Sequence, residues 1–199
     1  MRISLRPDVY TAGSGRIRAL QKQHGWFNKT EDYARNRLAI MTAQGNPAHI
    51  TGWVSLAAPG LKLCMPNPNT EGIAKHAIIP ALLHSGGKGL VDRIYHDKVK
   101  AGMTILTRIH HRQTPMMIMN GQCAAGVVWY TEAYFHASIV HHPLSLVKIQ
   151  ARQNHIMTYS AAVMRDAPHP RAAALFMRFL IGPEAQSIYR HYGFMAPGR

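Results

Sequence analysis

The polar segment Asn67-Pro68-Asn69-Thr70-Glu71-Gly72 has residue types suited to binding a ligand. It follows a short apolar run, 61–65, and leads into a segment with helical spacing of apolar residues, 73–82. This order predicts a strand, a turn and a helix. The first N–H groups of a helix lack helical partners, and the helix dipole favours negative charge there, so the turn could bind an anion. The alternative interpretation is an ordinary capped turn, with Asn69 or Thr70 as the N-cap.

Two further segments follow apolar runs in the same way. His110–Thr114 comes after the expected strand 103–109, and Trp129–Glu132 comes after the continuous apolar run 123–129. In open α/β sheets, ligands bind beyond the carboxyl ends of the strands. If the three turns converge, their N–H groups and hydroxyls would form an anion pocket.

The charge balance of the chain also suggests an anionic partner. The 199 residues include 23 Lys and Arg against 9 Asp and Glu, a formal net charge of +14. Such a balance fits nucleic acid, a membrane surface or a small oxyanion. The basic residues are scattered, however, and nucleic-acid-binding arms usually come as blocks of charge. We therefore do not expect a nucleic-acid partner, although a basic nucleic-acid-binding protein stays an alternative.

Cysteine and histidine usage gives no metal-type pattern. Cys64 and Cys123 both sit in apolar runs, which favours buried free thiols over a disulfide. The 13 histidines contain no HExxH motif or zinc-ligand spacing, so neither a metal nor another cofactor is expected. His111, Arg112 and Glu132 could host acid–base chemistry. Without a nucleophile elbow, P-loop or catalytic carboxylate pair, we do not expect an enzyme.

The remaining pattern alternates strands with helices. The chain lacks an apolar stretch of 18 residues, so no membrane insertion is expected. Residues 1–8 lack the hydrophobic core of a signal peptide. Alternation of this kind predicts α/β layers with a mostly parallel sheet. Further strands are expected at 8–12, 36–43, 144–149 and 158–164, and further helices at 16–24, 90–101, 171–181 and 183–192.

Two helical segments carry more detailed expectations. Pro80 should kink or shorten the helix after the polar turn, and Gly86, Gly87 and Gly89 should end it. Arg171–Ile181 is amphipathic, and one face is expected to be buried. That face consists of Ala172, Leu175, Phe176, Phe179 and Leu180.

Five segments also match known motifs in a fixed order. They are Arg6–Ala12, Asn36–Ile40 with Gly45–Pro47, Pro59–Gly72, Ala125–Trp129 and Pro183–Phe194. Together they resemble the type II periplasmic solute-binding proteins of ABC transporters, near the molybdate-binding branch. The resemblance covers nearly the whole chain.

The resemblance implies two α/β lobes that bind a solute between them. The second lobe would span 44–142, and the first lobe would combine 1–43 with 143–199. The first lobe is expected to be incomplete, because the chain starts at what resembles a later strand of the family. The implied function is that of a periplasmic protein that captures a small anionic solute, such as molybdate or tungstate. It would deliver this solute to an ABC transporter permease. A ligand-sensing regulatory domain of the same fold is the alternative.

The resemblance also implies which residues contact the solute. They are Asn69, Thr70, Glu71 and Gly72 on one turn, His111 and Arg112 near a second, Trp129 or Tyr130 at a third, and Ser14 as a candidate contact from the first lobe. Trp129 stands where the family usually has Tyr. Glu71 would repel molybdate unless it pairs with Arg112, so the ligand could be another anion.

Overall fold

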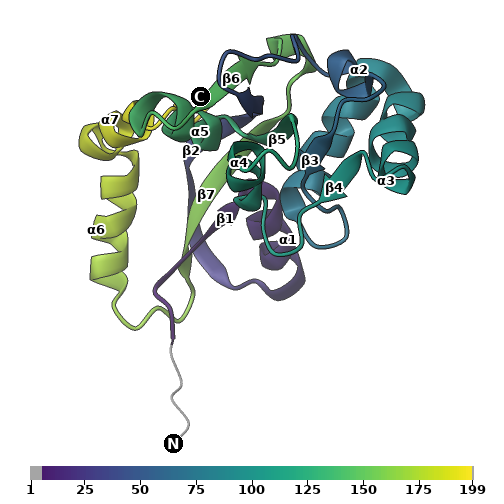
Figure 1. Cartoon of the computed structure of the whole chain (residues 1–199). Coiled ribbons are helices and arrows are strands. Elements are labelled where there is room, and N and C mark those ends of the chain that lie inside the picture. The colour runs from purple at the N-terminus through teal and green to yellow at the C-terminus, as the bar shows by residue number, and fades with distance from the viewer. Residues whose placement is uncertain (1–5, 199) are drawn as a thin grey trace, which may run out of the picture. The chain divides into compact units, whose positions relative to one another are not determined.

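The computed structural model describes residues 6–198 (Figure 1). Residues 1–5, which belong to the segment expected to lack a signal core, lie outside the described part. The chain forms two compact units, Met1–Asn36 with Met157–Arg199, and Arg37–Ile156. The expected second lobe, 44–142, falls inside the second of these units. None of the helices in the described part has the length and apolar character needed to span a bilayer.

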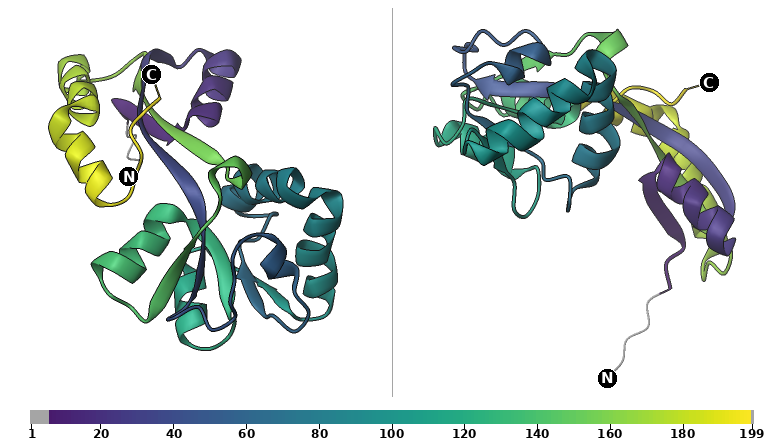
Figure 2. Two further views of the ribbon diagram at one scale, coloured as in Figure 1. Left: turned by 90° about the horizontal axis from the view of Figure 1, so that it is seen from above. Right: turned by 90° about the vertical axis from the view of Figure 1, so that its right-hand side faces the viewer.

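The first unit is a small antiparallel sheet with helices on both faces. Strand β7 lies between β1 and β2, and Val9 of β1 pairs with Val163 of β7. Ile17 and Leu20 of α1 pack on one face, whereas helices α6 and α7 cover the other (Figure 2). The elements are β1 (Val9–Gly13), α1 (Ser14–His24), the first part of β2 (Phe27–Ala43), β7 (Ile156–Met164), α6 (Pro170–Ile181) and α7 (Pro183–His191).

Helix α6 buries a different face from the one expected. The residues facing the core are Ala173, Met177 and Leu180. The expected face is wrong except for Leu180, since Leu175 is 60% exposed and Phe176 is 46% exposed. Both stripes of α6 are apolar, so helical spacing identifies them but cannot tell which one meets the sheet.

The second unit contains a mixed sheet in the order β6-β2-β5-β3-β4. Strand β3 pairs in parallel with β4 and β5, whereas β2 pairs antiparallel with β5 and β6. The expectation of a mostly parallel sheet is therefore wrong, because β2 is 17 residues long and runs against its neighbours. The strands added here are β3 (Leu63–Met65), β4 (Thr104–Leu106), β5 (Ala125–Trp129) and β6 (Leu144–Lys148).

The helical segments of this unit pack against the sheet around a core that includes Trp53, which donates its indole N–H to the Gln153 carbonyl over 2.9 Å. They are the short 3₁₀ turns η1 (Val54–Ala57) and η5 (Ala151–Gln153), the π-helical turns η2 (Ala74–Ile78), η3 (Arg93–Asp97) and η4 (Phe135–Ile139), and the α-helices α2 (Ile79–Asp92), α3 (Lys98–Lys100), α4 (Gln113–Met119) and α5 (Tyr130–Tyr134).

The glycines of α2 interrupt this helix, which consists of two helical stretches joined at a kink. Gly87 adopts φ 66° and ψ −168° inside α2, and the helical path continues to Asp92 and beyond. Pro80 lies where the π-helical turn η2 passes into α2, and the helical backbone continues through it, since Ile78 and Ile79 keep helical φ and ψ. The expected interruption at the glycines is therefore confirmed, since two helical stretches meet at Gly87. Burial of Leu90 and Ile94 against the core explains why the chain stays helical after the kink.

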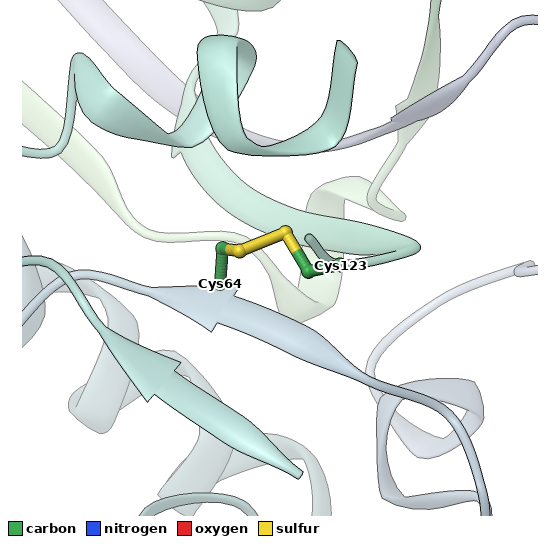
Figure 3. The surroundings of a disulfide bond; sticks show 2 residues. All are labelled: Cys64 and Cys123. Carbon is green, nitrogen blue, oxygen red and sulfur yellow. A yellow bond between two sulfur atoms is a disulfide. The ribbon is translucent and has the colours of Figure 1, made fainter. Parts of the chain in front are cut away.

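Cys64 and Cys123 form a disulfide, so the expectation of free thiols is wrong (Figure 3). Cys64 lies in β3 opposite Gly126 of β5, and Cys123 lies just before β5. Their Cα atoms are 5.8 Å apart, within the usual range for a disulfide. Pairing between β3 and β5 brings the two cysteines together, which a sequence separation of 59 residues does not reveal. Gly126 permits the close approach of β5 to β3, because a Cβ there would collide with the Cys64 carbonyl oxygen.

Substitutions on the two stripes of α6 should differ in cost. We expect Met177→Ala to lower the free energy of unfolding by about 2–4 kcal/mol, since it removes a buried side chain. Phe176→Ala should cost less than about 1 kcal/mol, because its side chain is largely in water. Urea denaturation of both variants measures the difference. A larger loss for Phe176→Ala would contradict the burial pattern.

The disulfide should contribute substantially to stability. The double variant Cys64→Ser/Cys123→Ser is expected to lose about 4 kcal/mol of unfolding free energy, as chain-entropy estimates give for a loop of this length. Guanidinium denaturation with and without a reducing agent tests this. The wild type should lose stability on reduction, whereas the double variant should not respond.

Candidate ligand-binding site

The turn after β3 and the loop after β4 meet at one edge of the second unit. Strands β3, β4 and β5 run in parallel, so their carboxyl ends lie at the same edge. Glu71 comes from the turn after β3, and it contacts Thr107 and His111 from the loop after β4. Glu132, in the helix that follows β5, is close enough for its charge to act on His111. The structure thus brings together the turns after β3, β4 and β5, in which all the candidate residues except Ser14 lie.

Glu71 is the centre of this arrangement. It is buried, and its Oε1 accepts hydrogen bonds from the Asn67 N–H over 3.1 Å and from the Thr107 hydroxyl. Its Oε2 lies 3.2 Å from Nδ1 of His111. The pairing with Arg112 on which molybdate binding at this turn would depend is not formed, because Glu71 pairs with His111 instead. Arg112 is exposed, and its N–H donates to Nδ1 of His110 over 3.2 Å.

The turn after β3 uses several of its own N–H groups. The Asn69 N–H donates to Oδ1 of Asn67 over 3.0 Å, and the Thr70 and Glu71 N–H groups donate to the Asn67 carbonyl. Asn67 thus organises the turn, not the expected caps Asn69 and Thr70, whose side chains are exposed together with Gly72. The N–H groups of Asn69, Thr70 and Glu71 are thus engaged within the turn.

Burial shifts the protonation of two groups beside Glu71. Burial lowers the pKa of His111 and the charge of His110 adds to this effect, whereas Glu71 and Glu132 oppose it. Burial, and then the charge of Glu71, raises the pKa of Tyr95, whose hydroxyl donates to the Pro66 carbonyl over 3.3 Å. Around neutral pH, His111 is therefore mainly an uncharged imidazole and Tyr95 is a neutral phenol.

A second group of titratable residues lies on the helix after β5 and in the loop that follows it. Nε2 of His136 is 3.5 Å from a Glu132 oxygen, and its Nδ1 is 2.7 Å from Nδ1 of His142. Burial lowers the pKa of His136. The sequence pattern singled out Glu132 but assigned no ligand-binding role to His136, His142 or Thr107. The spacing of four residues between Glu132 and His136 was the available signal.

A cavity of ≈ 620 Å³ adjoins the Glu71 group, along the loop after β4 and helix α4. Among its described lining residues there is no carboxylate. Gln113 holds the loop in place, because its Oε1 accepts hydrogen bonds from the N–H groups of Arg108 and Ile109. The polar and charged side chains of the lining are those of Thr107, Arg108, His110, Arg112, Gln113, Asn120 and Gln122.

The aromatic candidates lie at the end of β5. Trp129 is paired with Leu38 of β2 and packs partly against the core. The Tyr130 ring stacks on Tyr134 at 5.9 Å, and the Arg37 guanidinium lies 4.2 Å from the centre of the same ring. Both aromatic residues are half-buried and stay predictions as ligand contacts.

Ser14 belongs to the first unit. It is the first residue of α1, and it is only 7% exposed. Its role as a first-lobe contact stays a prediction.

Comparison with known proteins gives one family and a consistent fold. The family model described as bacterial extracellular solute-binding protein matches residues 2–195. No curated protein matches the chain. The sulfate-binding protein SubI from Mycobacterium tuberculosis superimposes with a TM-score of 0.78 at 20% identity, over 97% of this chain and 70% of SubI.

Two further solved structures have the same fold. The periplasmic molybdate-binding protein of Azotobacter vinelandii gives a TM-score of 0.75 at 20% identity, over 96% of this chain and 79% of its own. Iron-bound HitA from Pseudomonas aeruginosa gives 0.74 at 14% identity, over 95% and 69%. At these identities the likeness shows the fold alone.

The lowered pKa of His111 predicts a pH dependence of stability. Between the unfolded pKa near 6.5 and the lower folded value, the unfolded chain binds more protons, so the free energy of unfolding decreases as pH falls. His111→Gln should therefore lose less stability than the wild type between about pH 7.5 and 5. Urea denaturation across this range measures the slope. His84→Gln, which removes an exposed histidine of α2, serves as the control. Equal slopes for His111→Gln and wild type would contradict the prediction.

Proposed function

The chain belongs to the bacterial extracellular solute-binding proteins, and we propose that it captures a small anionic solute for an ABC transporter permease. The family consists of binding proteins, not enzymes. Two proteins with the same fold are named for binding sulfate and molybdate, which supports an oxyanion as the solute class. The Cys64–Cys123 disulfide supports a periplasmic location, because disulfides persist in oxidising compartments.

The cavity beside α4 is the observation that carries the anionic assignment. Arg108 and Arg112 are among its lining residues, together with Gln113, Asn120 and Gln122. Guanidinium groups bind oxyanions through charged hydrogen bonds, which are stronger than neutral ones. No acidic side chain among the described lining residues opposes an anion there.

The position of Glu71 refines where the anion would bind. Its carboxylate already takes the Thr107 hydroxyl and the Asn67 N–H, two donors that a solute could otherwise use. A free oxyanion in the turn would face this negative charge. We therefore place the solute in the cavity, against the loop after β4, rather than in the turn after β3.

A panel of anions tests the proposal. Sulfate, molybdate, tungstate, phosphate and small carboxylates are added to the chain while its thermal unfolding and heat of binding are measured. A true ligand at 100 times its Kd should stabilise the fold by about 2.7 kcal/mol. If no anion binds at millimolar concentration to a chain that circular dichroism shows to be folded, the anionic assignment is wrong.

Arg112 provides the sharper test. Arg112→Ala is expected to weaken binding of the active anion by about 1.5–3 kcal/mol, or roughly 10- to 150-fold, as for loss of a charged hydrogen bond. The matched control is Arg178→Ala, which removes an exposed arginine from α6 in the other unit. Calorimetry measures both. Unchanged affinity in Arg112→Ala would place the anion elsewhere.

A further inference from the structure

Glu71, His110 and His111 bring metal-ligating atoms close together. One atom from each residue can be chosen so that all three lie within 4.8 Å of one another. Oε2 of Glu71 and Nδ1 of His111 are 3.2 Å apart. Two ligands of a tetrahedral zinc ion, with bonds of about 2.1 Å, lie roughly 3.4 Å apart, so this pair already has a suitable separation.

The Glu71 carboxylate is held in the way that metal-binding carboxylates usually are. Its Oε1 accepts the hydrogen bonds from Asn67 and Thr107, which fix the plane of the carboxylate. Its Oε2 is directed toward His111 and is the atom that remains for a metal. Hydrogen bonds of this kind orient ligands and are commonly found around metal sites.

The position of the two histidines also suits a metal. His110 is exposed, and its ring centre lies 3.9 Å from that of His111. Coordination through Nδ1 would cost His110 the hydrogen bond that this atom accepts from the Arg112 N–H, whereas coordination through Nε2 would keep it. That loss is one weak contact on the surface of the loop.

We propose that Glu71, His110 and His111 bind a divalent transition-metal ion such as Zn²⁺. Two imidazoles and one carboxylate favour zinc, cobalt, nickel or copper over magnesium and calcium, which prefer all-oxygen ligands. Three protein ligands leave one tetrahedral position open. Because His110 also lines the cavity, that position can be reached by the anionic solute, and this last clause alone rests on the proposed function.

Titration of the EDTA-treated full chain, with its disulfide intact, tests the site. We expect one Zn²⁺ per chain by calorimetry, an intense visible spectrum with Co²⁺ and no heat with Mg²⁺. His111→Ala and His110→Ala should each weaken Zn²⁺ binding at least tenfold, whereas His84→Ala, on the exposed side of α2, should bind like wild type. Glu71→Gln, checked for folding by circular dichroism, should weaken binding similarly.

Two results would overturn the proposal. One is no Zn²⁺ binding at millimolar concentration by the folded chain. The other is Zn²⁺ binding that persists in His110→Ala and His111→Ala but is lost in His136→Ala, which would assign the ion to the Glu132 group.

Anions are titrated separately into metal-free and Zn²⁺-loaded chains. Zn²⁺ binding without any anion binding would leave the metal site standing and reject the proposed function. Equal anion affinities in the two forms would show that the anion does not reach the open coordination position of the metal.

Discussion

The buried carboxylate of Glu71 is the constraint on which the site depends. A carboxylate removed from water costs several kcal/mol unless it is paired and hydrogen-bonded. Here the compensating donors come from the turn after β3 and from the loop after β4. If the two segments moved apart, the carboxylate would lose these hydrogen bonds and its burial would no longer be compensated. The parallel pairing of β3 with β4 places those donors within reach, and the position of the whole group follows from that pairing.

The loop after β4 contributes both to the surroundings of the buried Glu71 carboxylate and to the lining of the proposed ligand cavity. Residues after β4 supply Thr107 and His111 to the buried carboxylate and Arg108 and Arg112 to the cavity. The positive charges therefore stand on a segment whose other side chains are anchored. Charge scattered along a sequence can thus become concentrated at one place once a loop is fixed, which is how a chain without basic runs can present a local anion site.

Local signals predicted much of the fold. Helices α1, α6 and α7 were found within two residues of their ends, because Gly25, Pro183 and similar residues mark helix boundaries locally. The order of motifs predicted the family. The sequence could not reveal the disulfide, the partner of Glu71 or the buried stripe of α6, since each depends on which distant segments pack together. Thr107 was missed because a lone threonine after a strand gives no signal of its own.

The exposed apolar stripe of α6 and the net charge of the chain have opposite effects on self-association in concentrated solution. Leu175, Phe176 and Phe179 offer apolar surface on which molecules can adhere to one another, while a net charge of +14 keeps them apart. Salt weakens only the second effect, since the screening length falls to about 8 Å at physiological ionic strength and about 3 Å at 1 M. Colloidal stability should therefore decrease as ionic strength rises, so dilute buffers suit concentrated samples of this protein better than saline ones.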